Sequence, residues 1–212
     1  MYVWVFQGNL GEGKTSAMSI LAHYYANRAK RIGIDTELYA NYGLRGARPL
    51  THYSDFYKVA KSESSICLLD EAQTSLDSRL FQKGSNIYLT QFFFYLRKLR
   101  SSLYMTTPNI RNLDSRIRAL CNILVDCHKT PAGFTYNIYD YQGEKLLRRR
   151  FLPMFKAQEI WKVGLYDTHQ IITSIEFPGS ERQFKQFLEQ IIEVNDTYRG
   201  RKLEDAEKEK AG

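Results

Sequence analysis

Cysteine is scarce in this 212-residue chain: only Cys67, Cys121 and Cys127 occur. An odd and sparse set excludes a disulfide framework and favours a reducing compartment. Cys121, Cys127 and the adjacent His128 do not have the spacing of any common zinc pattern. Because two of these residues lie in or beside an apolar segment, we expect buried thiols rather than a metal site.

Long apolar runs are also absent. The greasiest stretch, Phe92-Phe93-Phe94-Tyr95-Leu96, is far shorter than the roughly 18 residues of a membrane span. The first apolar run, at residues 2–6, is too short for a secretory signal peptide. The sequence therefore predicts a cytoplasmic protein with no membrane span of its own, unless a partner holds it at a membrane.

The bulk composition is that of a globular protein. Hydrophobic residues make up 43% of the chain and aromatic residues 14%, and the length suits one domain better than two. We expect that domain at residues 1–198. From residue 199 onward apolar residues become rare and charges alternate, which predicts a solvated or frayed tail at 199–212. A net charge of +7 favours a polyanionic partner.

A phosphate-binding loop is the strongest signal. Residues 8–15 read Gly-Asn-Leu-Gly-Glu-Gly-Lys-Thr, which satisfies the pattern G-x-x-x-x-G-K-[ST]. An apolar run precedes this loop and a predicted helix, about 15–31, follows it. In that context backbone N–H groups surround a polyphosphate, and the N-terminus of the helix adds positive potential. We expect ATP to bind Gly8, Asn9, Leu10, Gly11, Glu12, Gly13, Lys14, Thr15 and Ser16, with Lys14 on the β- and γ-phosphates and Thr15 on Mg²⁺.

The rest of the chain alternates between strand and helix patterns. Short β-prone runs at 36–40, 65–69, 103–105 and 121–126 are separated by predicted helices at 54–61 and 89–100. This alternation predicts an α/β fold with a mostly parallel sheet and helices on both faces, as in P-loop NTPases. Residues 134–152 change to period 2 and predict an inserted β-hairpin. An apolar stripe after Ser180 predicts a last amphipathic helix.

Two acids follow the apolar run Ile66-Cys67-Leu68-Leu69. A buried strand delivers Asp70 to the carboxyl edge of the sheet, where ligands of such sheets bind. We expect Asp70 to hold Mg²⁺ and Glu71 to orient and deprotonate the attacking water. The alternative is a helix N-terminus that merely carries two acids. An adjacent glutamate favours hydrolysis over simple phosphotransfer.

A third candidate site is Thr106-Thr107-Pro108-Asn109, after the strand at 103–105. In ATPases with an additional strand between the phosphate-loop strand and the Asp-Glu strand, a polar group here senses the γ-phosphate. Thr107 or Asn109 fits that role. An ordinary turn led by Pro108 explains the same residues.

Basic residues lie on both sides of this strand, with Arg97, Lys98 and Arg100 before it and Arg111, Arg116 and Arg118 after it. One of them, with Arg97, Arg116 and Arg118 as the candidates, could stabilise transition-state charge in a neighbouring subunit. Others could contact a nucleic-acid backbone. The alternative for each is a solvated surface. The hairpin also combines tyrosines with Arg148-Arg149-Arg150, which suits either nucleic-acid contact or ordinary edge structure.

Several motifs together resemble the HerA/FtsK superfamily of DNA-translocating ATPases. The resemblance is strongest to viral genome-packaging ATPases and to zonula occludens toxin-like phage assembly proteins, and it covers about residues 1–168. It rests on the loop at 8–15, on Leu68-Leu69-Asp70-Glu71, on Arg97-Lys98, on Leu113-Asp114-x-Arg116-Ile117-Arg118, and on the hairpin with the late Tyr166-Asp167-Thr168. The family usually has Thr-Gln where this chain has Thr107-Pro108.

The resemblance implies a catalytic-glutamate ATPase that assembles into a homo-oligomeric ring, with six subunits as the expectation, around DNA. Because no membrane helix follows the ATPase segment, the sequence favours the packaging branch: a motor that moves double-stranded DNA into a capsid, with capsid or portal proteins as partners. Two alternatives stay open at this point. One is a phage assembly or extrusion ATPase acting on single-stranded DNA, and the other is a nucleotide switch or small-molecule kinase.

Overall fold

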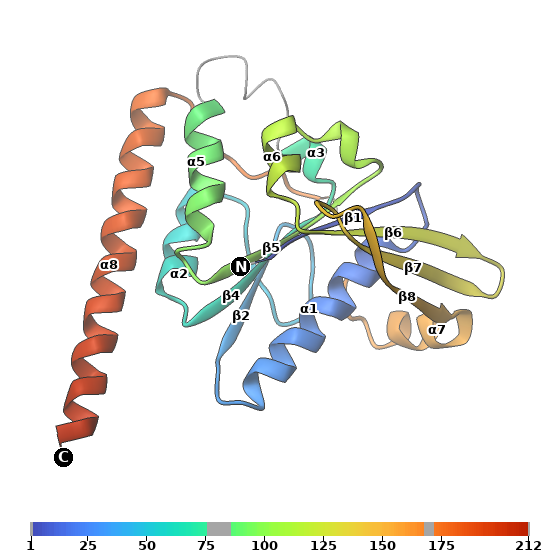
Figure 1. The fold of residues 1–212 in the computed structure, drawn as a ribbon, viewed down its shortest axis with the longest axis horizontal. Helices are drawn as coiled ribbons and strands as arrows, with labels where there is room; N and C mark the ends of the chain where they lie inside the picture. Colours follow the sequence, from blue (N-terminus) through green and yellow to red (C-terminus); the bar gives the residue numbers. More distant parts are fainter. Residues whose placement is uncertain (1, 76–85, 168–171, 212) are drawn as a thin grey trace.

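The computed structural model of the chain describes residues 2–75, 86–167 and 172–211, and the side chains within those ranges except at 75, 86–90 and 202–211. In this part of the chain an eight-stranded sheet has the order β3-β2-β4-β5-β1-β6-β7-β8 (Figure 1). The strands from β3 to β6 in that order are parallel, and β7 and β8 continue the sheet antiparallel. The predicted α/β fold is confirmed.

The predicted strands and helices occur in the predicted order, and β3, α3 and α7 are elements that the sequence patterns did not predict. The strands are β1 (Val3–Gln7), β2 (Thr36–Ala40), β3 (Arg48–Pro49), β4 (Ser64–Leu69), β5 (Ser101–Thr107), β6 (Ile123–Thr130), β7 (Gly133–Asp140) and β8 (Lys145–Pro153). The helices are α1 (Lys14–Lys30), α2 (Phe56–Lys61), α3 (Ala72–Ser75), α5 (Asn86–Leu96), α6 (Ser115–Leu120), α7 (Met154–Lys162) and α8 (Glu181–Ala211), with short 3₁₀ turns at Tyr53–Asp55 and Ile110–Asn112.

The strand β5 lies between β1 and β4. It is therefore the additional strand between the phosphate-loop strand and the strand that ends before Asp70. The hairpin β7–β8 is not a separate insertion on the core. Because β7 pairs with β6 along its whole length, the hairpin extends the central sheet.

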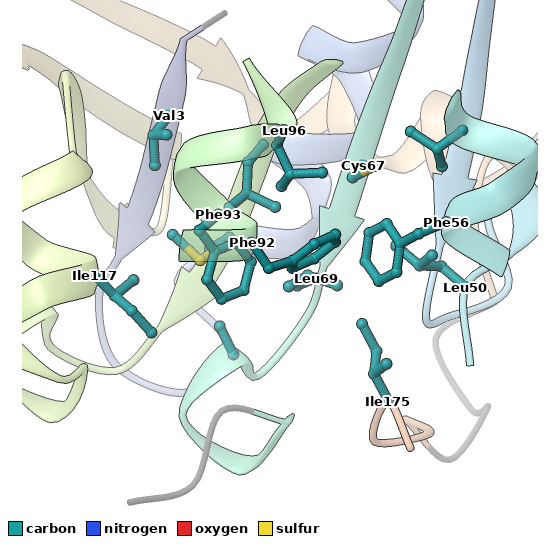
Figure 2. Packing of buried hydrophobic residues seen from close by; sticks show 14 of the residues in the cluster. Val3, Leu50, Phe56, Cys67, Leu69, Phe92, Phe93, Leu96, Ile117 and Ile175 are labelled. Atoms are coloured by element: carbon teal, nitrogen blue, oxygen red, sulfur yellow. The ribbon is translucent and has the colours of Figure 1, made fainter. Parts of the chain in front are cut away.

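Alternation along the strands divides the core into two layers. Val3 and Val5 of β1 face the layer that contains α2, α5, α6 and α8, whereas Phe6 faces α1. In the first layer Phe56 and Phe92 meet edge to face with ring centroids 4.5 Å apart, and Leu69 lies beside them (Figure 2). Helix α8 packs along α2 and α5 at one side of the molecule (Figure 1).

Two helix ends differ from the sequence prediction. The helix predicted at 89–100 ends at Leu96, and a turn carries the chain to Arg100, which has a left-handed backbone with φ of 57°. The guanidinium of Arg100 donates to the carbonyls of Ala60 and Ser62, so tertiary hydrogen bonds draw this residue out of the helix. The helix predicted at 54–61 begins at Phe56, and the 3₁₀ turn before it has His52 as its N-cap.

The charged segment 199–212 was predicted to be solvated or frayed. The backbone of α8 continues through it to Ala211, so the helix does not fray there, and the solvation of this segment stays a prediction. Lys, Glu and Ala dominate this stretch and are strong helix formers, so the loss of apolar residues does not end the helix. Among the residues described, no helix is both long enough and apolar enough to cross a bilayer.

Candidate nucleotide-binding site

The phosphate loop connects the end of β1 at Gln7 to the start of α1 at Lys14. Two of its glycines are required by close contacts. A Cβ on Gly8 would lie 2.6 Å from the carbonyl oxygen of Cys127, and one on Gly13 would lie 2.7 Å from the ring of Phe134. Both positions also have positive φ, which L side chains rarely adopt. The loop can therefore keep this conformation and this packing against Cys127 and Phe134 only with glycine at these positions.

Lys14 lies inside the loop. Its side chain is 5% exposed, and its Nζ donates to the carbonyl oxygen of Asn9 at 3.0 Å. The carboxylate of Glu12 accepts the backbone N–H of Asn9 in the same loop. A buried ammonium that donates to a neutral carbonyl is well placed to bind an incoming anion.

Asp70 and Thr15 meet below the loop. The hydroxyl of Thr15 is 3.0 Å from each carboxylate oxygen of Asp70. Burial raises the pKa of the Asp70 carboxyl above its ordinary value, while hydrogen bonds from Thr106 and Thr15 act in the opposite direction. Asn41, at the end of β2, fixes the backbone of Asp70 by exchanging two hydrogen bonds with it. Sequence reasoning missed Asn41; its signal is its place at the carboxyl end of the strand beside β4.

Glu71 has a left-handed backbone, with φ of 50°. This conformation is strained for a residue other than glycine and is often found at functional sites. The N–H of Glu71 donates to Thr106 Oγ1 at 2.9 Å, and its carboxylate accepts a hydrogen bond from the amide of Gln73. Glu71 and Asp70 line the same cavity as the phosphate loop.

Thr106 is the threonine that joins this site. It is fully buried, and its hydroxyl donates to Asp70 Oδ1 at 2.5 Å while accepting the N–H of Glu71. The sequence prediction named Thr107 or Asn109 instead. Thr107 donates to the carbonyl of Asn109, and the Asn109 side chain caps the turn that follows. The contacts therefore do not support a sensor role for Thr107 or Asn109.

The alternation of β5 explains this difference. Tyr104 of β5 packs in the layer of α1, whereas Leu103 and Met105 pack in the opposite layer. Thr106 therefore faces the side of the phosphate loop, and Thr107 faces away from it. The sequence signal that could have selected Thr106 is the alternation of faces along the strand, continued from the apolar residues 103–105 to residue 106.

The structure does not bring the three candidate arginines to the site. Arg97 is exposed in the turn before β5, and the seven-residue strand separates that turn from the loop by roughly 20 Å. Arg118 holds its own turn, because its guanidinium donates to the carbonyls of Arg111 and Leu113. Arg116 is exposed at the start of α6. A role of any of these arginines in a neighbouring subunit stays a prediction.

The site opens into a cavity of about 500 Å³, a size typical of small-molecule sites. One wall is the phosphate loop with Asp70 and Glu71. The other is aromatic and includes Phe134, Trp161 and Tyr166. Sequence reasoning did not assign this wall. Tyr166 and Asp167 line the cavity, and Thr168 of the same motif lies outside the described residues.

The thiols of the three cysteines do not line the cavity. All three are buried as free thiols, and burial raises the pKa of each to about 12. His128 contacts Asp126 rather than a cysteine. Within the described residues, no group of three His, Cys, Asp or Glu side chains could hold a metal ion. The prediction of buried thiols is confirmed.

Comparison with known proteins identifies a related family. The sequence model of the zonular occludens toxin (Zot) family matches residues 47–151, a span that includes Asp70, Glu71 and most of the hairpin but not the phosphate loop. No curated protein matches the sequence.

Two solved structures are similar to this chain in their fold. The N-terminal domain of zonular occludens toxin from Neisseria meningitidis is 17% identical, with a TM-score of 0.56, over 78% of this chain and 98% of that one. The genome packaging NTPase B204 from Sulfolobus turreted icosahedral virus 2, in complex with AMPPCP, is 10% identical, with a TM-score of 0.49, over 72% of this chain and 98% of that one. The chain therefore has the α/β fold of P-loop NTPases, and over residues 47–151 it resembles the zonular occludens toxin family.

Proposed function

We propose that this protein binds and hydrolyses ATP with Mg²⁺ at the phosphate loop. The observation that carries the proposal is the contact between Asp70 and Thr15 directly below the loop that holds Lys14. One carboxylate and one hydroxyl would give a metal ion only two ligands from the protein. That set fits Mg²⁺, which keeps several waters and is completed by the phosphates of its substrate.

Each residue has a separate task. The loop amides and Lys14 bind the β- and γ-phosphates, and Lys14 exchanges the Asn9 carbonyl for a phosphate oxygen. Asp70 and Thr15 hold Mg²⁺, which when bound neutralises the charge that develops on the phosphate oxygens. Glu71 orients a water in line with the γ-phosphate and accepts its proton. Thr106 positions the two acids, since it bonds to the carboxylate of one and the backbone of the other.

The replacement Glu71→Gln tests the catalytic role. Gln keeps the shape and hydrogen-bonding capacity of Glu but cannot take the proton, so hydrolysis should fall by about 10²-fold or more while ATP still binds. A matched control is Glu144→Gln, because Glu144 also has positive φ but lies exposed in the hairpin turn. Phosphate release and equilibrium binding of ATP are measured for both. Unchanged hydrolysis in Glu71→Gln would refute the assignment.

We further propose that hydrolysis drives DNA movement during phage assembly or extrusion. The match to the Zot family supports this branch over the packaging of double-stranded DNA into a capsid. The charge distribution supports a DNA partner, because Arg148, Arg149 and Arg150 are all exposed on the edge strand β8. The proposal includes a homo-oligomeric ring, so that DNA could pass along equivalent hairpins.

Steady-state ATP hydrolysis with single-stranded and with double-stranded DNA separates the two branches. Greater stimulation by single-stranded DNA supports assembly or extrusion, and greater stimulation by double-stranded DNA supports packaging. Either stimulation should weaken as salt is raised, because phosphate contacts release counterions. The mass of the particle in the presence of ATP analogue and DNA tests the ring. A rate of ATP hydrolysis that neither DNA changes would favour a nucleotide switch or a kinase.

A further inference from the structure

A segment that includes Trp161 and Tyr166 contacts the start of α1 beside the phosphate loop. Its contacts converge on Ser16, the residue after Lys14 and Thr15. The indole N–H of Trp161 donates to Ser16 Oγ at 3.2 Å, and the hydroxyls of Ser16 and Tyr166 are 2.5 Å apart. Ser16 itself is 2% exposed. A buried hydroxyl thus ties two aromatic side chains, 145 and 150 residues away in sequence, to the nucleotide site.

The ring of Trp161 is held on a second side by Phe134. The two rings meet edge to face at an interplanar angle of 79°, with centroids 6.1 Å apart. Phe134 is 1% exposed and stacks on Tyr136, whose hydroxyl donates to the carbonyl of Gly13. The position of the indole is therefore fixed by the core and by the loop, not by solvent-facing contacts.

Trp161 nonetheless remains 39% exposed and lines the cavity. A large aromatic surface that is rigidly held and left open to water is unfavourable by itself. Covering this aromatic surface with a flat apolar ligand removes it from water and is therefore favourable. In this cavity the adjoining wall is built for phosphates, so the ligand has a polyanionic end and a planar end.

The arrangement of the strands orients such a ligand. Asp70, Glu71 and Thr106 come from β4 and β5, on one side of β1, and Phe134 comes from β7, on the other side of β1 beyond β6. A triphosphate with its γ-phosphate at Glu71 therefore directs the remainder of the nucleotide toward Ser16 and Trp161. The polar and aromatic walls match the two ends of one nucleotide.

We propose that Trp161 is the stacking platform for the base of the nucleotide, and that Ser16 and Tyr166 hold this platform in place. The inference rests on the proposed function, because it assigns the base subsite of the same pocket. The competing explanation is that Trp161 only anchors α7 on the loop.

Binding of Mg-ATP and of inorganic tripolyphosphate by Trp161→Ala and Trp161→Phe distinguishes these roles. Stacking of a base on an aromatic ring predicts that Trp161→Ala raises the Kd for ATP by about 5- to 150-fold and leaves the Kd for tripolyphosphate unchanged. Trp161→Phe keeps a ring and should lie close to wild type. Phe155→Ala is the matched control, because Phe155 is another exposed aromatic on α7 but does not line the cavity.

Three results would overturn the inference. Equal weakening of both ligands by Trp161→Ala would show an anchoring role, and unchanged binding of both would show that the ring is not used. If the wild-type protein binds tripolyphosphate as tightly as ATP, the pocket has a phosphate site but no base subsite. If wild type binds neither ligand, the proposed function fails together with the inference. Tripolyphosphate binding also reports that each variant is folded.

Tryptophan fluorescence gives an independent reading. The chain has two tryptophans, Trp4 and Trp161, and Trp4 packs against Tyr25 and Tyr104, away from the cavity. In a Trp4→Phe variant the remaining signal comes from Trp161 alone. ATP should change that emission, and tripolyphosphate should change it much less. Equal changes with both ligands would contradict stacking.

Discussion

Two adjacent buried threonines allow a sharp test of how the site is held together. Thr106 and Thr107 are both fully buried, and each is hydrogen-bonded. Thr106→Val keeps the volume but removes the hydroxyl that donates to Asp70 and accepts from the N–H of Glu71. The change therefore breaks one bond to a carboxylate and leaves one backbone donor without its partner.

The expected loss of stability follows from those two bonds. A hydrogen bond to a charged group contributes about 1.5–3 kcal/mol, and an unsatisfied buried donor costs about 1–3 kcal/mol. Since part of this loss is relieved by relaxation, we expect Thr106→Val to lower the free energy of unfolding by about 2–4 kcal/mol. Thr107→Val removes a single bond to the carbonyl of Asn109 and should cost about 1 kcal/mol.

The rate of ATP hydrolysis should also differ between Thr106→Val and Thr107→Val. Thr106 holds the strained backbone of Glu71, so its loss should lower the turnover of ATP even where the protein remains folded. Thr107→Val should leave turnover near wild type. The assays are denaturant unfolding and steady-state phosphate release for both variants. A Thr107→Val enzyme that is more impaired than Thr106→Val would refute the placement of Thr106 and restore the sensor role to Thr107.

Two further predictions concern the acid and the loop. Burial raises the pKa of the Asp70 carboxyl above its ordinary value near 3.8, so Asp70 binds its proton more tightly in the folded state than in the unfolded state. The free energy of unfolding of the wild type therefore falls as the pH rises from about 3.8 through this raised pKa. In denaturant unfolding, Asp70→Asn should therefore be more stable than wild type at pH 7, and this gain should disappear below pH about 3.8. Asp70→Asn should also be inactive. An Asp70→Asn variant that is less stable than wild type at pH 7 would contradict this prediction. Gly13→Ala should destabilise the protein more than Gly11→Ala in thermal unfolding, because both have φ near 80° but only Gly13 faces the ring of Phe134; equal effects would show that the ring contact is unimportant.

The polar wall of the site could be predicted because it is encoded locally. Residues 8–15 form a continuous motif, and Asp70 ends an apolar strand, so parallel strands alone place both at one edge of the sheet. Thr106 was within reach of the same reasoning, since it depends only on which face each residue of β5 occupies.

The aromatic wall could not be predicted from the sequence. Trp161 and Phe134 reach the loop only because the hairpin extends the sheet and α7 packs against β7 and β8 beside the start of α1. No local pattern marks either residue. The turn at Arg100 is similar, because hydrogen bonds to residues 60, 62 and 195 decide where α5 ends. Such features depend on contacts between distant segments.

A crystal structure with Mg²⁺ and a non-hydrolysable ATP analogue is the most direct test of the account. The phosphates should lie within the loop at 8–15, with Lys14 moved from Asn9 to a phosphate oxygen and the metal beside Thr15 and Asp70. An empty loop, or a nucleotide bound elsewhere with Asp70 and Glu71 facing away from it, would contradict the central claim.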